Sequence, residues 1–182
     1  MDLFSANQLM WAAFIIGNSA PLLFIVLYKK QKISVELLNL YFLGVFVGLS
    51  WEIPFALAGK SFHLILIDWP IDLPLVRNIT YSFIDGLIFI VGVFLAKKFL
   101  KTNDFLYRFN SKALFIMIFW GSFSEFLVDL NGNGKLWLFI ENWYNPVFIT
   151  INGNGLTIIP QLIWFVAPIV YYFLILKFQS KI

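Results

Sequence analysis

The chain of 182 residues contains no cysteine and a single histidine, His63. Without cysteine there is neither a disulfide framework nor a thiolate metal site, and one histidine leaves zinc or haem short of ligands. The sequence also lacks a phosphate-binding glycine loop, a Gly-x-Ser-x-Gly elbow and an aspartate-rich diphosphate motif. We therefore expect no metal and no cofactor.

Charge is scarce as well, since only 13% of the residues are charged whereas 60% are apolar and 20% aromatic. This balance lies far outside that of soluble domains and predicts one integral-membrane domain over residues 1–182. The net charge is +3, but the basic residues form short clusters between apolar runs, so we expect no nucleic-acid partner. The segment Met1 to Gln8 has Asp2 and no basic residue, unlike a cleaved signal peptide, so the first apolar run is expected to stay.

Five apolar runs are long enough to cross a bilayer as helices, which takes about 20 residues. The predicted fold is thus an all-α, polytopic membrane helix bundle of about five transmembrane helices. The runs are Leu9 to Tyr28, Leu37 to Leu57, Ile79 to Ala96, Ala113 to Leu130 and Leu156 to Leu176.

Lysine and arginine are distributed unequally between the connections. One side has ten: Lys29, Lys30, Lys32, Lys97, Lys98, Lys101, Arg108, Lys112, Lys177 and Lys181. The other side has Lys60, Arg77 and Lys135. The positive-inside rule then places the N-terminus outside and the C-terminus in the cytoplasm of a multi-pass cell-membrane protein.

Both outer connections are expected to be partly embedded. Phe62 to Pro70 is too apolar for a free loop and too short to span, which favours an interfacial segment anchored by Trp69. Trp11, Trp143 and His63 are also read as interfacial. In the second connection, two Asn-Gly-Asn-Gly turns at 131–134 and 152–155 bracket a β-branched and aromatic stretch with a turn at Asn145-Pro146, which predicts a hairpin or re-entrant lid.

Four carboxylates fall in the outer half of the predicted helices: Glu52, Asp85, Glu125 and Asp129. An ionisable residue inside a membrane helix is costly and indicates function. Helical spacing places Gly44, Gly48 and Glu52 on one face, and small residues on such a face let a neighbouring helix approach. Gly121, Glu125 and Asp129 share a face of the fourth helix in the same way, and Asp85, Gly92 and Ala96 share one of the third.

The acids are therefore expected to meet in one pocket, where they are the candidate catalytic residues. Crowded carboxylates in an apolar site repel one another, so one of them is expected to keep a proton and serve as an acid. The candidate substrate-binding residues at the same depth are Trp51, Tyr81, Ser124, Trp137, Gln161 and Trp164. Their aromatic faces suit a cation.

Two other interpretations of the acids stay open. Glu125 and Asp129 are unexceptional if they lie at the water interface, and Glu52 is structural if it bonds a serine across a helix contact. The run from Asp129 to Gly134 matches the first half of a calcium loop, but the acid of the second half is missing, because Ile140 stands at its place and Glu141 is one residue late. A plain Asn-Gly turn is the preferred interpretation.

With Trp51-Glu52 in its second helix and acids in later helices, the chain resembles the integral-membrane terpene cyclases of meroterpenoid pathways. Its five-helix plan resembles the emopamil-binding sterol isomerases, although Gly48 stands where these carry a histidine before the second-helix acid. Both resemblances imply intramembrane carboxylates that move protons on a hydrophobic substrate. They make Glu52 the first candidate acid and Glu125 or Asp129 its partner.

Three functions remain open at this point. The first is an enzyme that cyclises, isomerises or hydrates an isoprenoid-like lipid. The second is a proton- or cation-coupled transport or binding protein, with hinges at Gly17 to Pro21 and Pro160 to Pro168. The third is a non-catalytic subunit that binds another membrane protein through its glycine faces. Membrane lipids and a hydrophobic small molecule are the expected partners, and the sequence does not define an oligomeric state.

Overall fold

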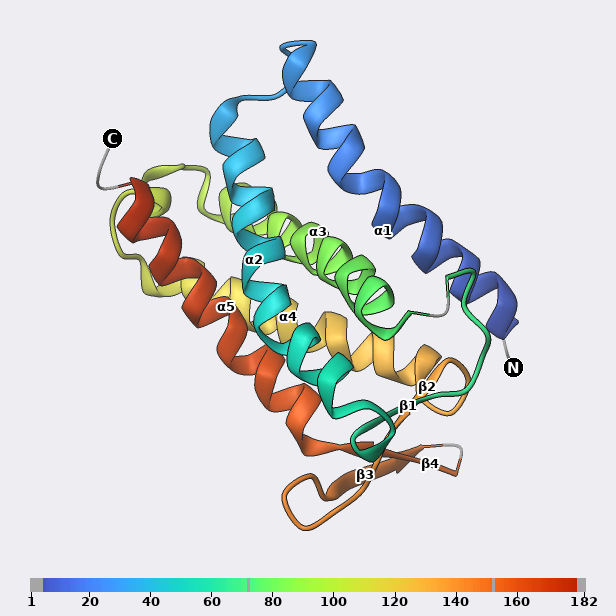
Figure 1. Ribbon diagram of the computed structural model, residues 1–182. Helices are drawn as coiled ribbons and strands as arrows, with labels where there is room; N and C mark the ends of the chain where they lie inside the picture. The colour runs from blue at the N-terminus through green and yellow to red at the C-terminus, as the bar shows by residue number, and fades with distance from the viewer. Residues whose placement is uncertain (1–4, 72, 152, 180–182) are drawn as a thin grey trace.

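The computed structural model describes residues 5–71, 73–151 and 153–179, and Figure 1 shows a helical bundle with short strands gathered at one end. Asp2, Asn152 and Lys181, which entered the expectations above, lie outside the described residues. The long helices are α1 (Ala6–Lys29), α2 (Val35–Ala58), α3 (Pro74–Leu100), α4 (Ser111–Gly132) and α5 (Ile158–Gln179). The short elements are η1 (Gly59–Ser61), β1 (His63–Ile65), η2 (Asp104–Leu106), β2 (Trp137–Phe139), β3 (Val147–Ile151) and β4 (Asn154–Thr157).

Local signals in the sequence account for where several helices begin. Ser5 and Gln8 form a capping box at the start of α1, and the Ser34 hydroxyl accepts from the Leu37 backbone N–H at the start of α2. Asn110 caps α4 in the same manner. α3 begins with Pro74, a residue suited to the first turn because it has no N–H to leave unpaired.

All five long helices are long and apolar enough to cross a membrane, which confirms the predicted number. The main difference is in α3, which begins at Pro74 and not near Ile79, so that Arg77 and Asn78 belong to the helix and are buried. The predicted helix breaks at Gly17 to Pro21 and Pro160 to Pro168 are wrong, because α1 continues through Pro21 and α5 continues through Pro168.

Glycines set the closest helix contacts, as expected from their spacing. α2 packs on α3 where a Cβ added to Gly44 would lie 3.1 Å from the Cα of Gly86. α4 packs on α5 where Gly121 faces Pro168. The bundle core lies between these contacts and is filled largely by aromatic and β-branched side chains.

The strands close one end of the bundle, called here the strand end. β1 pairs antiparallel with β2, so that residues from the second and fourth connections meet, and β3 pairs with β4 in a hairpin. The fold is therefore not purely α. Gly134 and Gly153 adopt φ of 77° and 81°, the left-handed turn conformation that favours glycine.

The structure corrects two details of the expected outer connections. The hairpin is not bracketed by the two Asn-Gly-Asn-Gly repeats, because Asn131 and Gly132 of the first end α4, and the described residues of the second, 153–155, lie within the β3–β4 hairpin. Trp69 is only 6% exposed and packs on Phe14 and Tyr81, so it does not face outward as an anchor. Trp143, at 92% exposed, has the outward position expected of one.

Candidate functional site

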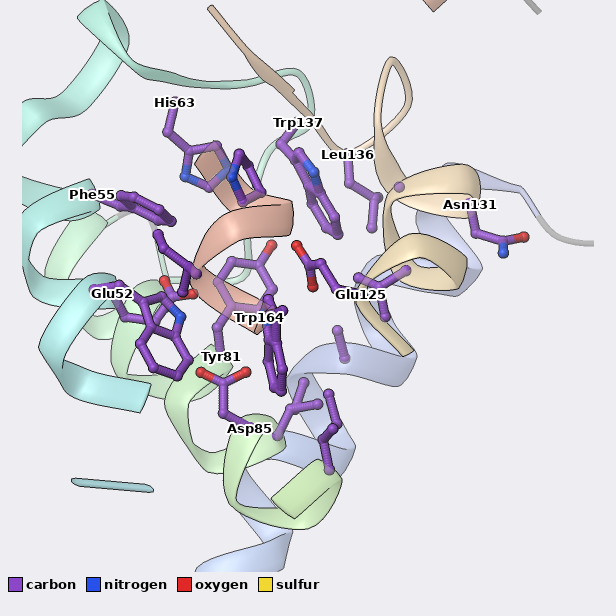
Figure 2. A pocket seen from close by; sticks show the side chains of 18 of the residues that line it. Glu52, Phe55, His63, Tyr81, Asp85, Glu125, Asn131, Leu136, Trp137 and Trp164 are labelled. Carbon is purple, nitrogen blue, oxygen red and sulfur yellow. The ribbon is translucent and has the colours of Figure 1, made fainter. Parts of the chain in front are cut away.

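A cavity of about 610 Å³ lies inside the strand end of the bundle. Its walls are mostly apolar and come from all five long helices and from the β1–β2 sheet. Figure 2 shows the side chains of Glu52, Asp85 and Glu125 arranged around this space. They come from α2, α3 and α4, so the cavity brings together acids that are far apart in the sequence.

The packing of α2 on α3 places the first two acids. Gly48 lies against Asp85, since a Cβ added at Gly48 would be 2.6 Å from its Oδ2 atom. One helical turn later, Glu52 accepts a hydrogen bond of 2.6 Å from the Nδ2 amide of Asn78. The small residue thus lets the two helices approach closely enough for both acids to face the cavity.

Asp129 does not line the cavity and has a different environment. Its Oδ1 accepts from the Trp137 indole at 3.4 Å, and its Oδ2 accepts from the Gln161 amide at 2.9 Å. These bonds tie α4 to β2 and to α5. Asp129 is therefore placed next to Glu125 as a buried structural acceptor, one turn away from the cavity wall.

The predicted binding residues separate into two groups. Trp51, Tyr81, Trp137 and Trp164 line the cavity. Ser124 and Gln161 do not, because the Ser124 hydroxyl donates to the Trp120 carbonyl of its own helix and Gln161 holds Asp129. Trp51 and Trp164 meet edge to face at 5.6 Å and form one aromatic wall.

Sequence reasoning missed His63 as a cavity residue. It was read as interfacial, yet it is buried, stacks on Phe139 at 4.7 Å and lines the cavity from β1. Burial, together with the positive charge of Arg77, lowers the pKa of His63 to about 3. The ring is therefore neutral at physiological pH. A signal was present, since His63 is the one imidazole of the sequence and stands within an apolar stretch.

Several buried polar atoms around the cavity lack a hydrogen-bond partner among the described residues. They include Nε2 of His63, the hydroxyl of Tyr81 and Oδ2 of Asp85. All three residues line the same cavity. Because buried polar groups are nearly always paired, three such atoms in one cavity indicate a place for a polar group from outside the chain.

The calcium-loop alternative does not match the local structure. Residues from Asp129 to Gly132 are helical, and the Asn131 amide donates to the Leu127 carbonyl of that helix. Among the described residues, no group of three or more acidic or histidine side chains is arranged to hold a metal ion.

Fold and site together define a small helical protein whose long helices are able to span a membrane and enclose an acid-lined apolar cavity. No family model, curated protein or solved structure matches this chain.

Proposed function

We propose that this protein is a multi-pass membrane enzyme that performs acid–base chemistry on a lipid-soluble, isoprenoid-like substrate. One observation carries the proposal: carboxylates from three helices line one largely apolar cavity in a bundle of membrane-length helices. An apolar cavity of this size is suited to a hydrophobic molecule. Carboxylates held in it are the groups that give a proton to such a substrate or take one away.

Two of the three acids, Glu52 and Asp85, have different surroundings, as expected of groups with different roles. Glu52 already accepts a strong hydrogen bond from Asn78, whereas Oδ2 of Asp85 has no partner among the described residues. A carboxylate held by a donor keeps its charge more readily than one without. We assign the base to Glu52, and the proton donor to Asp85 or Glu125.

A transport function is the second candidate, but the opposite half of the bundle gives it little support. The buried side chains there are mainly apolar, such as Val45, Val93 and Met117. The hydroxyls of Tyr41 and Tyr171 donate to the carbonyls of Phe83 and Leu40. A transport path needs polar groups through the whole membrane, and the described residues favour a cavity with one closed end.

The third candidate, a subunit that binds another protein through its glycine faces, also loses its main argument. Gly44 and Gly48 face α3, and Gly121 faces α5. These faces are used within the chain.

The test is to purify the protein from its host membrane and to analyse the lipids that copurify by mass spectrometry. Wild type is compared with Glu52→Gln, Asp85→Asn and Glu125→Gln, and with Glu141→Gln as a control because Glu141 is exposed at the strand end. We expect a specific isoprenoid species that wild type and the control convert and the three cavity variants bind unchanged. Bulk phospholipid alone, with no difference between the variants, would refute the enzyme proposal.

A further inference from the structure

The cavity is not closed on all sides, and its open side lies between α1 and α4. Ile16 of α1 is 49% exposed, and Leu127 and Val128 of α4 are 41% and 39% exposed, yet all three line the cavity. α1 packs mainly on α3, and α4 packs on α3 and α5. Ile84 and Ile88 of α3 line the same cavity, between α1 and α4. The opening is thus largely apolar, with Asn131 of α4 as an exposed polar residue of the lining, and it faces sideways, across the helices.

The strand end, in contrast, covers the cavity. His63 of β1 and Trp137 and Phe139 of β2 line it from that side. The two strands are paired in register, with His63 opposite Phe139 and Ile65 opposite Trp137. Water at the strand end is therefore separated from the acids by paired backbone and aromatic rings, and the sideways opening is the more direct route.

A second cavity, of about 490 Å³, lies between α2 and α5 and shares Trp51, Phe55 and Ile163 with the first. It has no carboxylate in its walls. Ser50 lines this second cavity, and the Ser50 hydroxyl donates to the Val47 carbonyl of the same helix. The rings of Trp51 and Phe55 stand in the shared wall, which makes this groove the less direct route to the acids.

The polar atoms of the cavity indicate what head group fits there. The Tyr81 hydroxyl has a proton to donate, and Oδ2 of Asp85 accepts. Neutral His63 offers one ring nitrogen of each kind. An alcohol satisfies both needs because it donates and accepts. An ammonium group has no acceptor for the Tyr81 proton, and an anionic head would be repelled by the Glu52 carboxylate, the assigned base.

From this arrangement we infer that the substrate is a lipid alcohol that enters from the bilayer between α1 and α4. Its hydroxyl pairs with the Tyr81 hydroxyl and with a carboxyl group of the cavity, and its hydrocarbon chain lies along Ile16, Ile88 and Val128. This inference rests on the proposed function, since it names the substrate class and the route for the same cavity.

Photocrosslinking on the full chain in phosphatidylcholine nanodiscs tests the inference. The probes are two geranylgeraniol analogues, one with a diazirine beside the hydroxyl and one with a diazirine at the far end of the chain. Only labelling that unlabelled geranylgeraniol displaces is counted, which removes general lipid contacts. We expect the first probe to label Tyr81, Asp85 or Glu125, and the second to label Ile16, Leu127 or Val128.

A matched pair of variants on α1 tests the route. Ile16→Trp fills the opening, whereas Ile25→Trp places the same ring at another exposed isoleucine, 36% exposed, that does not line the cavity. We expect Ile16→Trp to reduce displaceable labelling by about tenfold or more, which corresponds to about 1.4 kcal/mol of binding free energy. Ile25→Trp should leave the labelling unchanged. Geranylgeranyl diphosphate should not displace the probes.

The outcomes separate the inference from the proposed function. If the first probe labels the acids but the far-end probe labels Val166 and Val170 of the α2–α5 groove, only the proposed route is overturned. Displacement by the diphosphate would overturn the uncharged head group. If neither probe labels the cavity while the cavity variants still retain a specific lipid, the lipid-alcohol inference fails and the enzyme proposal stands. If no specific lipid is found either, both fail.

Discussion

At the scale of single residues, the site depends on how each buried polar group is paired. Glu52 has Asn78, and Asp129 has Trp137 and Gln161. His63 and Asp85 keep atoms without partners among the described residues. Paired groups stabilise the fold, whereas unpaired ones reduce its stability until a ligand satisfies them.

The Asn78–Glu52 hydrogen bond predicts a measurable coupling. Asn78→Leu leaves a buried carboxylate without its donor, so we expect a loss of about 2 kcal/mol in the free energy of unfolding in detergent. Glu52→Gln keeps an acceptor for Asn78 and should cost less. In the double variant the cost of Asn78→Leu should shrink, and strictly additive effects would show that the two side chains do not interact.

His63 predicts a specific pH dependence of stability. Between about pH 6.5 and pH 3 the unfolded chain binds a proton on His63 and the folded chain does not, so stability falls as the pH falls through this window. From pH 7 to pH 5 the wild type should lose about 2 kcal/mol more than His63→Phe, whose ring is able to stack on Phe139 and does not titrate. Parallel pH profiles of the two proteins would contradict a buried neutral histidine.

At the scale of elements, the closeness of α2 and α3 decides whether the acids share the cavity. Gly48 lies against Asp85, and the contact leaves no room for a methyl group. Gly92 of α3 has more space, because an added Cβ would be 3.3 Å from Trp120 and 3.7 Å from Met117. The two glycines therefore differ in what they permit, although both lie inside helices.

This difference predicts opposite results for one type of substitution. Gly48→Ala should cost about 1–3 kcal/mol of stability through overpacking, and it should displace Asp85 and abolish conversion of the lipid. Gly92→Ala should be close to neutral, since the gain in helix propensity of about 1 kcal/mol offsets the tight contact. Thermal unfolding in detergent and lipid analysis measure both effects. A tolerated, active Gly48→Ala would mean that α2 and α3 are farther apart than described.

The β1–β2 sheet provides a second test at this scale. Leu64 and Leu138 are paired across the two strands and are only partly buried, outside the cavity lining. Because the chain has no cysteine, Leu64→Cys with Leu138→Cys places a single disulfide that locks the sheet. Labelling by the geranylgeraniol probes should then be equally fast with and without reductant. Labelling that requires reductant would mean that the substrate enters beneath the sheet.

At the scale of the whole molecule, the alternation of helices places the strands and the acid-lined cavity at one end. The opposite end contains basic clusters at the ends of helices, such as Lys29–Lys30 after α1 and Lys97–Lys98 in the last turn of α3. The positive-inside rule then predicts that the strand end faces outward and that the substrate is used from the outer half of the bilayer.

Single cysteines in the cysteine-free chain test this orientation. Trp143→Cys lies at the strand end, and Asn103→Cys lies in the connection between α3 and α4; both positions are exposed. In intact cells, a membrane-impermeant maleimide should label Trp143→Cys only, and Asn103→Cys should react after the membrane is opened. The reverse pattern would show that the orientation is the opposite one. Labelling of both positions in intact cells would show that α4, which separates them, does not cross the membrane.

The sequence by itself determined the number of long helices, because an apolar run of membrane length has few alternatives to a helix. It also located the acids, since Gly44, Gly48 and Glu52 share a face by helical period alone. Contacts between distant segments were decided by tertiary structure only. The pairing of β1 with β2 buries His63. The early start of α3 at Pro74 places Asn78 in the helix, where it bonds Glu52. Gln161 donates to Asp129, which does not line the cavity. Periodicity describes one element at a time, and these contacts depend on how elements far apart in the chain pack together.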